Sequence, residues 1–163
     1  VGAGATGARP DDSRVAWSAV GGDSARLGPV GRAMADLLAS HGEPVDLTVG
    51  VEKAGAPLAT AVARELDTDL ATYTPAKHRW EGGDLGEGGS FSRNFASIRE
   101  RDCYVVDDIV TSGTTMRETV DAVAAEGGRV VACVVLVDKQ GLQRLEGVPV
   151  YSLIDVVRVG DEE

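Results

Sequence analysis

One segment, residues 104–116, constrains the fold of this chain more than any other. Its sequence is YVVDDIVTSGTTM, so an apolar, β-branched run leads into two acids, Asp107 and Asp108, and then into a loop of small residues rich in hydroxyl groups. Such a run is typical of a buried strand, and such a loop commonly opens a helix. The segment therefore predicts a strand, a loop and a helix in succession, with the acidic pair at the carboxyl end of the strand.

The residue types of this segment predict a site for a ribose phosphate. Ionised carboxylates only accept hydrogen bonds, which suits the vicinal hydroxyls of a sugar. The N–H groups of the loop and the positive end of the helix dipole converge on one point, where a phosphate binds well. The predicted ligand-binding residues are Asp107, Asp108, Thr111, Ser112, Gly113, Thr114 and Thr115. The alternative is a buried strand followed by a helix that Asp108 or Thr111 merely caps.

Further periodic segments indicate the rest of the fold. Apolar residues recur at helical spacing over 27–38, and residues 57–66 and 115–126 also predict helices. Strands are predicted at 46–51, 70–73, 104–106, 130–137 and 148–153. This alternation predicts an α/β fold with an open, mainly parallel, twisted sheet flanked by helices, whose ligand sites lie beyond the carboxyl ends of the strands.

A second loop, residues 50–57, follows a predicted strand and has the sequence GVEKAGAP. Its glycines permit unusual backbone angles, and a lysine stands beside the start of the next helix. We expect this loop to bind a diphosphate through Glu52, Lys53, Ala54 and Gly55. The alternative is a tight turn that joins strand to helix and carries a solvated lysine.

A third candidate segment is the long, polar, glycine-rich stretch from 75 to 102. Loops of this length are usually functional or disordered. Lys77 and His78 are its candidate ligand contacts, and the alternative is a solvated basic patch on an acidic protein.

Length and composition favour one domain that is not embedded in a membrane. A chain of 163 residues can bury a proper core, and no stretch approaches the roughly 18 apolar residues of a membrane span. Cys103 and Cys133 lie in apolar runs, where a small buried side chain is the ordinary interpretation, and no disulfide is expected. The expected location is the cytoplasm.

The charge of the chain limits the classes of partner that it can bind. The formal net charge is −10, and lysine occurs only at Lys53, Lys77 and Lys139. This pattern indicates a halophilic protein, because salt screens the repulsion between acidic groups, and an ordinary solvated acidic face is the alternative. DNA binding needs clustered basic side chains, so we do not expect this domain to bind DNA by itself.

The first residues differ in character from the rest. Residues 1–14 are rich in glycine and alanine and show no periodicity, so they predict a flexible linker. We expect this linker to follow a missing N-terminal DNA-binding domain, and the remnant of an expression tag is the alternative. Residues 15–163 are then the ligand-binding domain.

Several of these motifs resemble the type I phosphoribosyltransferases. Residues 104–116 resemble the family's signature for phosphoribosyl diphosphate (PRPP), and residues 50–57 resemble its pyrophosphate loop. Residues 137–141 (VDKQG) and 147–153 (GVPVYSL) look like the orotate branch, so the resemblance covers residues 45–157. It implies the family's fold, with residues 77–93 as a flexible hood that closes over the diphosphate.

Two departures from the family pattern imply a sensor rather than a catalyst. Ala54 stands where orotate enzymes carry lysine and adenine enzymes carry arginine, and residues 17–27 replace the base-binding segment of the orotate enzymes. The chain most resembles the phosphoribosyltransferase-like transcriptional regulators of haloarchaea. In these regulators a helix-turn-helix precedes such a domain and the protein controls genes of sugar catabolism.

This resemblance implies a homodimer that binds PRPP or a phosphorylated sugar and reaches DNA only through its N-terminal domain. The competing hypothesis is an active phosphoribosyltransferase for orotate or another base, which uses PRPP and Mg²⁺. In that enzyme Asp107 and Asp108 would stabilise charge on the sugar ring and hold the metal indirectly, and Lys77 would be catalytic. A third hypothesis is a metabolic binding module without any link to DNA.

Overall fold

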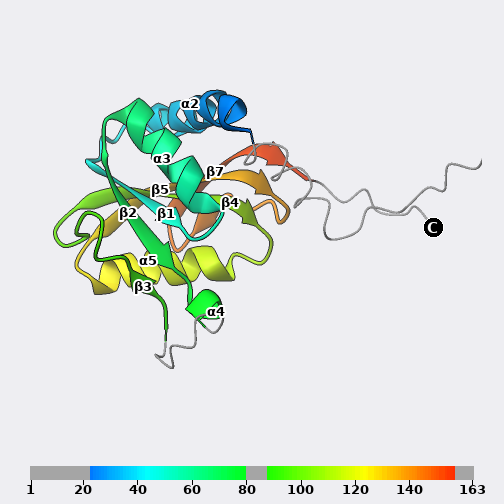
Figure 1. The fold of residues 1–163 in the computed structure, drawn as a ribbon. Helices are drawn as coiled ribbons and strands as arrows, with labels where there is room; N and C mark the ends of the chain where they lie inside the picture. Colours follow the sequence, from blue (N-terminus) through cyan, green and yellow to red (C-terminus); the bar gives the residue numbers. More distant parts are fainter. Residues whose placement is uncertain (1–22, 80–87, 157–163) are drawn as a thin grey trace, which may run out of the picture.

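The central feature of the fold is a mainly parallel sheet with helices on both faces (Figure 1). The computed structural model describes residues 23–79 and 88–156. The helices of these ranges are α2 (Ser24–Ser40), α3 (Gly55–Leu66), α4 (Ala76–Arg79) and α5 (Thr114–Ala125). The strands are β1 (Leu47–Val51), β2 (Asp69–Thr74), β3 (Ser90–Phe91), β4 (Asp102–Val110), β5 (Arg129–Asp138), β6 (Arg144–Leu145) and β7 (Val148–Asp155).

The order of the strands places a ligand site at one position in the sheet. Within the described ranges the order is β3-β2-β1-β4-β5-β7-β6, and only the outermost pairs, β2 with β3 and β6 with β7, are antiparallel. The chain passes from β1 to β2 on one side and then returns to β4 on the other. Such a reversal opens a crevice at the carboxyl ends of the two strands. The predicted fold class is confirmed.

The structure corrects the predicted boundaries at the acidic pair. The predicted strand ends at residue 106, whereas β4 continues through both acids to Val110. The reason is that β5 extends beside it, with Asp107 opposite Val135 and Val110 opposite Asp138, while the pairing of β4 with β1 stops at Val106. The acidic pair therefore lies inside β4, beyond the last residue of β4 that pairs with β1.

The described part of the stretch from 75 to 102, predicted as a loop, contains two short elements, α4 and β3. Elements of four and two residues are too short to show a periodicity in sequence. The middle of the hood, residues 80–87, lies outside the described residues, as do the predicted linker, residues 1–14, and most of the segment from 17 to 27.

Apolar side chains fill the space on both faces of the sheet. Met34 of α2 and Leu58 of α3 are fully buried on one face, and Met116 of α5 is buried on the other. Along β4, Val105 packs on the side of α5 while Val106 packs on the side of α2 and α3, as the alternation of a strand requires. Figure 1 shows the two helices and α5 on opposite sides of the sheet.

No helix in the described part of the chain combines the length and apolar character that crossing a bilayer requires. Cys103 and Cys133 are buried and free, so the predicted burial of both thiols is confirmed. Burial raises the pKa of the Cys103 thiol to about 12, which keeps it protonated and unreactive at neutral pH.

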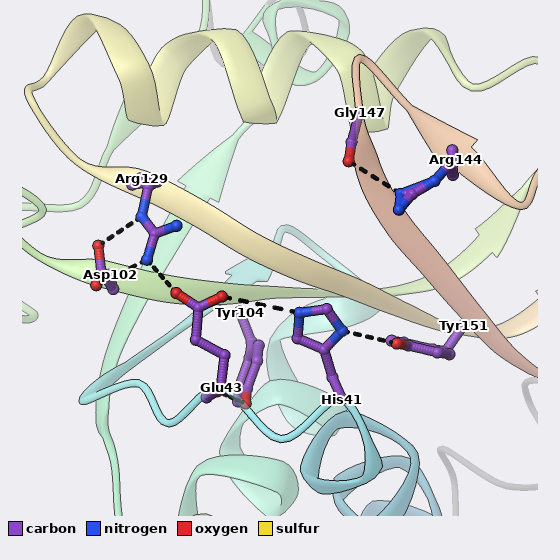
Figure 2. Close-up of polar contacts among 8 residues, drawn as sticks. All are labelled: His41, Glu43, Asp102, Tyr104, Arg129, Arg144, Gly147 and Tyr151. Atoms are coloured by element: carbon purple, nitrogen blue, oxygen red, sulfur yellow. Dashed lines mark hydrogen bonds and ion pairs between the residues drawn. The ribbon is translucent and has the colours of Figure 1, made fainter.

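A polar network joins the end of α2 to the amino ends of the central strands (Figure 2). Arg129, the first residue of β5, donates to both carboxylate oxygens of Asp102 at 3.1 Å and also to Glu43. His41, which caps α2, lies 2.9 Å from the hydroxyl oxygen of Tyr151 on β7 and 3.9 Å from the Glu43 carboxylate. These partly exposed contacts each contribute little free energy, but together they fix where α2 ends on the sheet.

Helices α2 and α3 approach closely at Gly31. A Cβ atom at this position would lie 2.4 Å from the Cβ of Ala61 and 3.1 Å from its carbonyl carbon. Gly31 is itself buried, so no side chain there can turn away into solvent. The absence of a side chain therefore sets the distance between the two helices.

We expect Gly31→Ala to lower the free energy of unfolding by about 1–3 kcal/mol, because the new methyl group overlaps Ala61 and separates the helices. Ala61→Gly removes the overlapping methyl group, so the double variant should recover part of this loss, although glycine within α3 costs about 1 kcal/mol. Chemical denaturation in molar KCl measures both single variants and the double variant. Losses that simply add in the double variant would contradict this packing.

Candidate functional site

A cavity of about 300 Å³ lies at the carboxyl ends of β1 and β4. It is bounded by the loop before α3, by α4, by the end of β4 and by the start of α5. The structure brings almost all of the predicted site residues together here. Those that line the cavity are Glu52, Lys53, Ala54, Lys77, His78, Asp107, Asp108, Thr111, Ser112, Gly113, Thr114 and Thr115.

Gly55 does not line the cavity, but it sets the distance between α3 and β4. A Cβ atom on Gly55 would lie 2.9 Å from the carbonyl oxygen of Val106 and 3.0 Å from both Cα and Oδ1 of Asp107. Only glycine lets the first turn of α3 lie against the acidic pair. Ala54, the N-cap residue, makes no side-chain cap, so a bound anion can accept hydrogen bonds from the first N–H groups of α3.

The loop from 111 to 115 brings a second helix start to the same cavity. Gly113 is the N-cap residue of α5, has a φ of 82°, and provides no side-chain cap. The alternative prediction, in which Asp108 or Thr111 caps this helix, is therefore wrong. Within the loop, the Ser112 hydroxyl donates to Oγ1 of Thr114 at 3.0 Å. Hydroxyl groups and backbone N–H groups thus gather where the positive end of the α5 dipole meets the cavity.

The first acid, Asp107, is buried and carries an altered pKa. Its side chain is 7 % exposed, and its Oδ1 accepts a hydrogen bond from the backbone N–H of Asp108 at 2.8 Å. Burial raises the pKa of Asp107 well above its ordinary value, and the side-chain hydrogen bond and negative charge of Asp108 raise it further. The backbone hydrogen bond from Asp108 and the positive charge of Lys77 act in the opposite direction on the same pKa.

Helix α4 carries the two predicted basic residues of the hood to the cavity. Lys77 and His78 both line it, and the charge of Lys77 reaches Asp107. Helix α5 fixes the position of α4. The backbone N–H of Ala76 donates to the carboxylate of Glu118, a residue of α5, at 3.3 and 3.4 Å. Sequence reasoning missed Glu118, since a glutamate within a helix gives no sign of what lies opposite it.

The site offers little to a metal ion by itself. In residues 23–79 and 88–156 no cluster of three or more His, Cys, Asp or Glu side chains could hold one. The acidic pair supplies two carboxylates, and Mg²⁺ usually takes one or two carboxylates together with water and the phosphates of a substrate. The donor set therefore fits Mg²⁺ that arrives with a diphosphate and does not form a dedicated metal centre.

Known proteins resemble this chain in sequence and in fold. The model of the phosphoribosyl transferase domain family matches residues 17–160. Among curated proteins, the transcriptional regulator GfcR of Halorubrum lacusprofundi is 69% identical over 153 residues, which are 93% of this chain and 72% of that protein. GfcR of Haloferax volcanii is 60% identical over 154 residues, covering 94% and 73%.

Solved structures share the fold at lower identity. Orotate phosphoribosyltransferase of Mycobacterium tuberculosis in complex with PRPP superposes with a TM-score of 0.68 at 20% identity, covering 91% of each chain. Adenine phosphoribosyltransferase of Thermoanaerobacter pseudethanolicus gives 0.67 at 20% identity, covering 84% of each. At such identities the likeness concerns the fold alone. Together with the family match and the regulators of high identity, it shows that this chain belongs to the phosphoribosyl transferase domain family, on the branch of the GfcR transcriptional regulators.

Proposed function

We propose that this chain is the ligand-sensing domain of a transcriptional regulator of sugar metabolism, and that it binds PRPP or another phosphorylated sugar between β1 and β4. One observation carries the proposal. Two helices whose N-cap residues provide no side-chain cap begin at the same cavity of about 300 Å³ that the pair of carboxylates lines. A pentose phosphate has hydroxyls at one end and a phosphate at the other, which matches this distribution of acceptors and donors.

Each part of the ligand has a partner in this proposal. The 5-phosphate lies at the start of α5, where hydroxyl-rich residues and N–H groups meet, and the ribose hydroxyls donate to Asp107 and Asp108. In PRPP, the diphosphate reaches the loop from Glu52 to Gly55 at the start of α3 and lies beside Lys77. Mg²⁺, when bound, neutralises charge on that diphosphate.

The relatives and the residues of the loop support the role of a sensor. Curated relatives of 60 to 69% identity are regulators by name. In this chain Ala54, whose side chain carries no charge, lines the cavity. By resemblance, this is the position where the orotate and adenine enzymes carry a lysine or an arginine. We infer that the protein is a cytoplasmic, halophilic homodimer that reaches DNA through a separate N-terminal domain. Its ligand switches DNA binding by favouring one arrangement of the dimer, since equal affinity for both would shift nothing.

A second candidate function is phosphoribosyl transfer. The position of Lys77 near the acidic pair favours it, because a cation at this place can stabilise a leaving diphosphate. Asp107 and Asp108 would then stabilise positive charge on the ribose ring. Binding and turnover distinguish the two functions.

We expect PRPP with Mg²⁺ to bind this chain in molar KCl with one site per chain, and we expect orotate to release no pyrophosphate from the complex. Isothermal titration measures the first and a coupled pyrophosphate assay measures the second. Steady turnover with orotate or another base would overturn the sensor in favour of the enzyme. If neither PRPP nor ribose 5-phosphate binds, the proposed site itself is wrong.

Asp107→Asn is expected to weaken PRPP binding by about tenfold or more, because hydrogen bonds to a charged acceptor are worth about 1.5–3 kcal/mol. The same variant should be more stable than the parent near pH 8. The raised pKa means that the folded state holds the proton on Asp107 more tightly than the unfolded chain does. The free energy of unfolding therefore falls as the pH rises from about 4 through the raised pKa of Asp107. Asparagine carries no charge and avoids this loss.

Thermal unfolding from pH 5 to 8 and PRPP titration test both effects of Asp107→Asn. One unit of pKa shift corresponds to about 1.4 kcal/mol, or a few degrees in melting temperature for a domain of this size. Asp36→Asn is the matched control, since it removes the same charge from an exposed position on α2. Asp108→Asn should also weaken binding. If PRPP affinity is unchanged in both variants, the ribose hydroxyls do not donate to these carboxylates as proposed.

A further inference from the structure

Gln140 lies against the loop from 111 to 115 and is not among the residues that line the cavity. The end of its side-chain amide is 2.6 Å from the carbonyl oxygen of Thr111 and 3.0 Å from that of Ser112. An amide oxygen here would face two acceptors, whereas an amide nitrogen donates to both, so the nitrogen belongs on this side. One side chain thus holds two successive carbonyl groups of the loop.

The turn that carries Gln140 is itself held in place. Asp138, the last residue of β5, is 3 % exposed, and its Oδ1 accepts hydrogen bonds from the backbone N–H groups of Gln140 at 2.8 Å and Gly141 at 3.0 Å. The backbone N–H of Lys139 donates to the carbonyl oxygen of Val110 at 2.9 Å, just before the loop. Gln140 therefore approaches the loop from a fixed turn at the end of the neighbouring strand.

Holding a carbonyl group also orients the N–H group of the same peptide unit. In a trans peptide the C=O and N–H bonds point in opposite directions. The peptide bonds that join Thr111 to Ser112 and Ser112 to Gly113 are trans, because the cis bond of the described residues is Glu52-Lys53. With both carbonyl groups directed at Gln140, the N–H groups of Ser112 and Gly113 point to the other side of the loop. The cavity is bounded by that loop.

We propose that Gln140 is a positioning residue of the site, which orients the N–H groups of Ser112 and Gly113 toward the phosphate of the ligand. This inference rests on the proposed function, since it concerns how the same site recognises a phosphate. Gln140 makes no contact with the ligand. It acts by preorganising the loop, so the donors need not be reoriented when the phosphate arrives.

The chemistry of the amide singles out one substitution. Gln140→Glu keeps the size of the side chain but replaces the nitrogen donor by a carboxylate oxygen, which repels both carbonyl groups. Gln140→Ala only removes the two hydrogen bonds. Gln143→Glu is the matched control, because it introduces the same charge three residues further along the chain on an exposed side chain.

The test is a titration of the four proteins with PRPP and Mg²⁺ in molar KCl, together with amide NMR spectra of each protein with inorganic phosphate. We expect affinity for PRPP to fall about fivefold in Gln140→Ala and about tenfold or more in Gln140→Glu, as the loss of hydrogen bonds of ordinary strength implies. Gln143→Glu should bind as the parent does. In the ligand-free Gln140 variants, the amide signals should move at residues 111–115 while the melting temperature stays within about 2 °C of the parent, since an exposed side chain adds little to stability.

The outcomes separate this inference from the function on which it rests. If the parent binds PRPP and Gln140→Glu binds it equally well, the positioning role is wrong and the proposed function stands. A fall in affinity of the same size in Gln143→Glu would also overturn the role, because charge alone would then explain the effect. If the parent binds none of PRPP, ribose 5-phosphate and inorganic phosphate, both proposals are wrong.

Discussion

The site depends on the close contact between the first turn of α3 and the middle of β4. Because Gly55 has no side chain, the backbone of α3 packs against Val106 and Asp107, where even a methyl group would overlap both residues. This contact brings the start of one helix beside an acidic pair that already adjoins the start of another. A larger residue at this position would separate the parts of the cavity without altering any residue that lines it.

The two ends of the sheet serve different purposes. At the amino ends of β4 and β5, Arg129 compensates the charges of Asp102 and Glu43, and these contacts fasten a helix to the sheet. At the carboxyl ends, Asp107 is buried against a second acid, and the N-cap residues of two helices, Ala54 and Gly113, provide no side-chain cap. Groups that lower stability are thus concentrated where a ligand can satisfy them, which is typical of functional sites.

The sequence was sufficient to predict the sheet, its principal helices and the residues that gather at the cavity, because the apolar runs and the small-residue loops are local patterns. It was not sufficient for features that depend on contacts between distant segments. The extension of β4 to Val110 requires β5 beside it, and the placement of α4 requires Glu118, 42 residues from Ala76 in sequence. The role of Gln140 also depends on a partner outside its own segment. Packing, and not local preference, decides such details.

The burial of Asp107 has a consequence for what such a domain can detect. In the proposed complex, a sugar hydroxyl that donates to this side chain stabilises its ionised form, whereas burial in the ligand-free domain raises the pKa of Asp107 and so disfavours that form. In the proposed sensor, sugar binding and proton release would then be linked, so the affinity would rise with pH wherever the occupied site has the lower pKa. Under this proposal, the occupancy of the domain would depend on the acidity of its surroundings as well as on the concentration of its ligand.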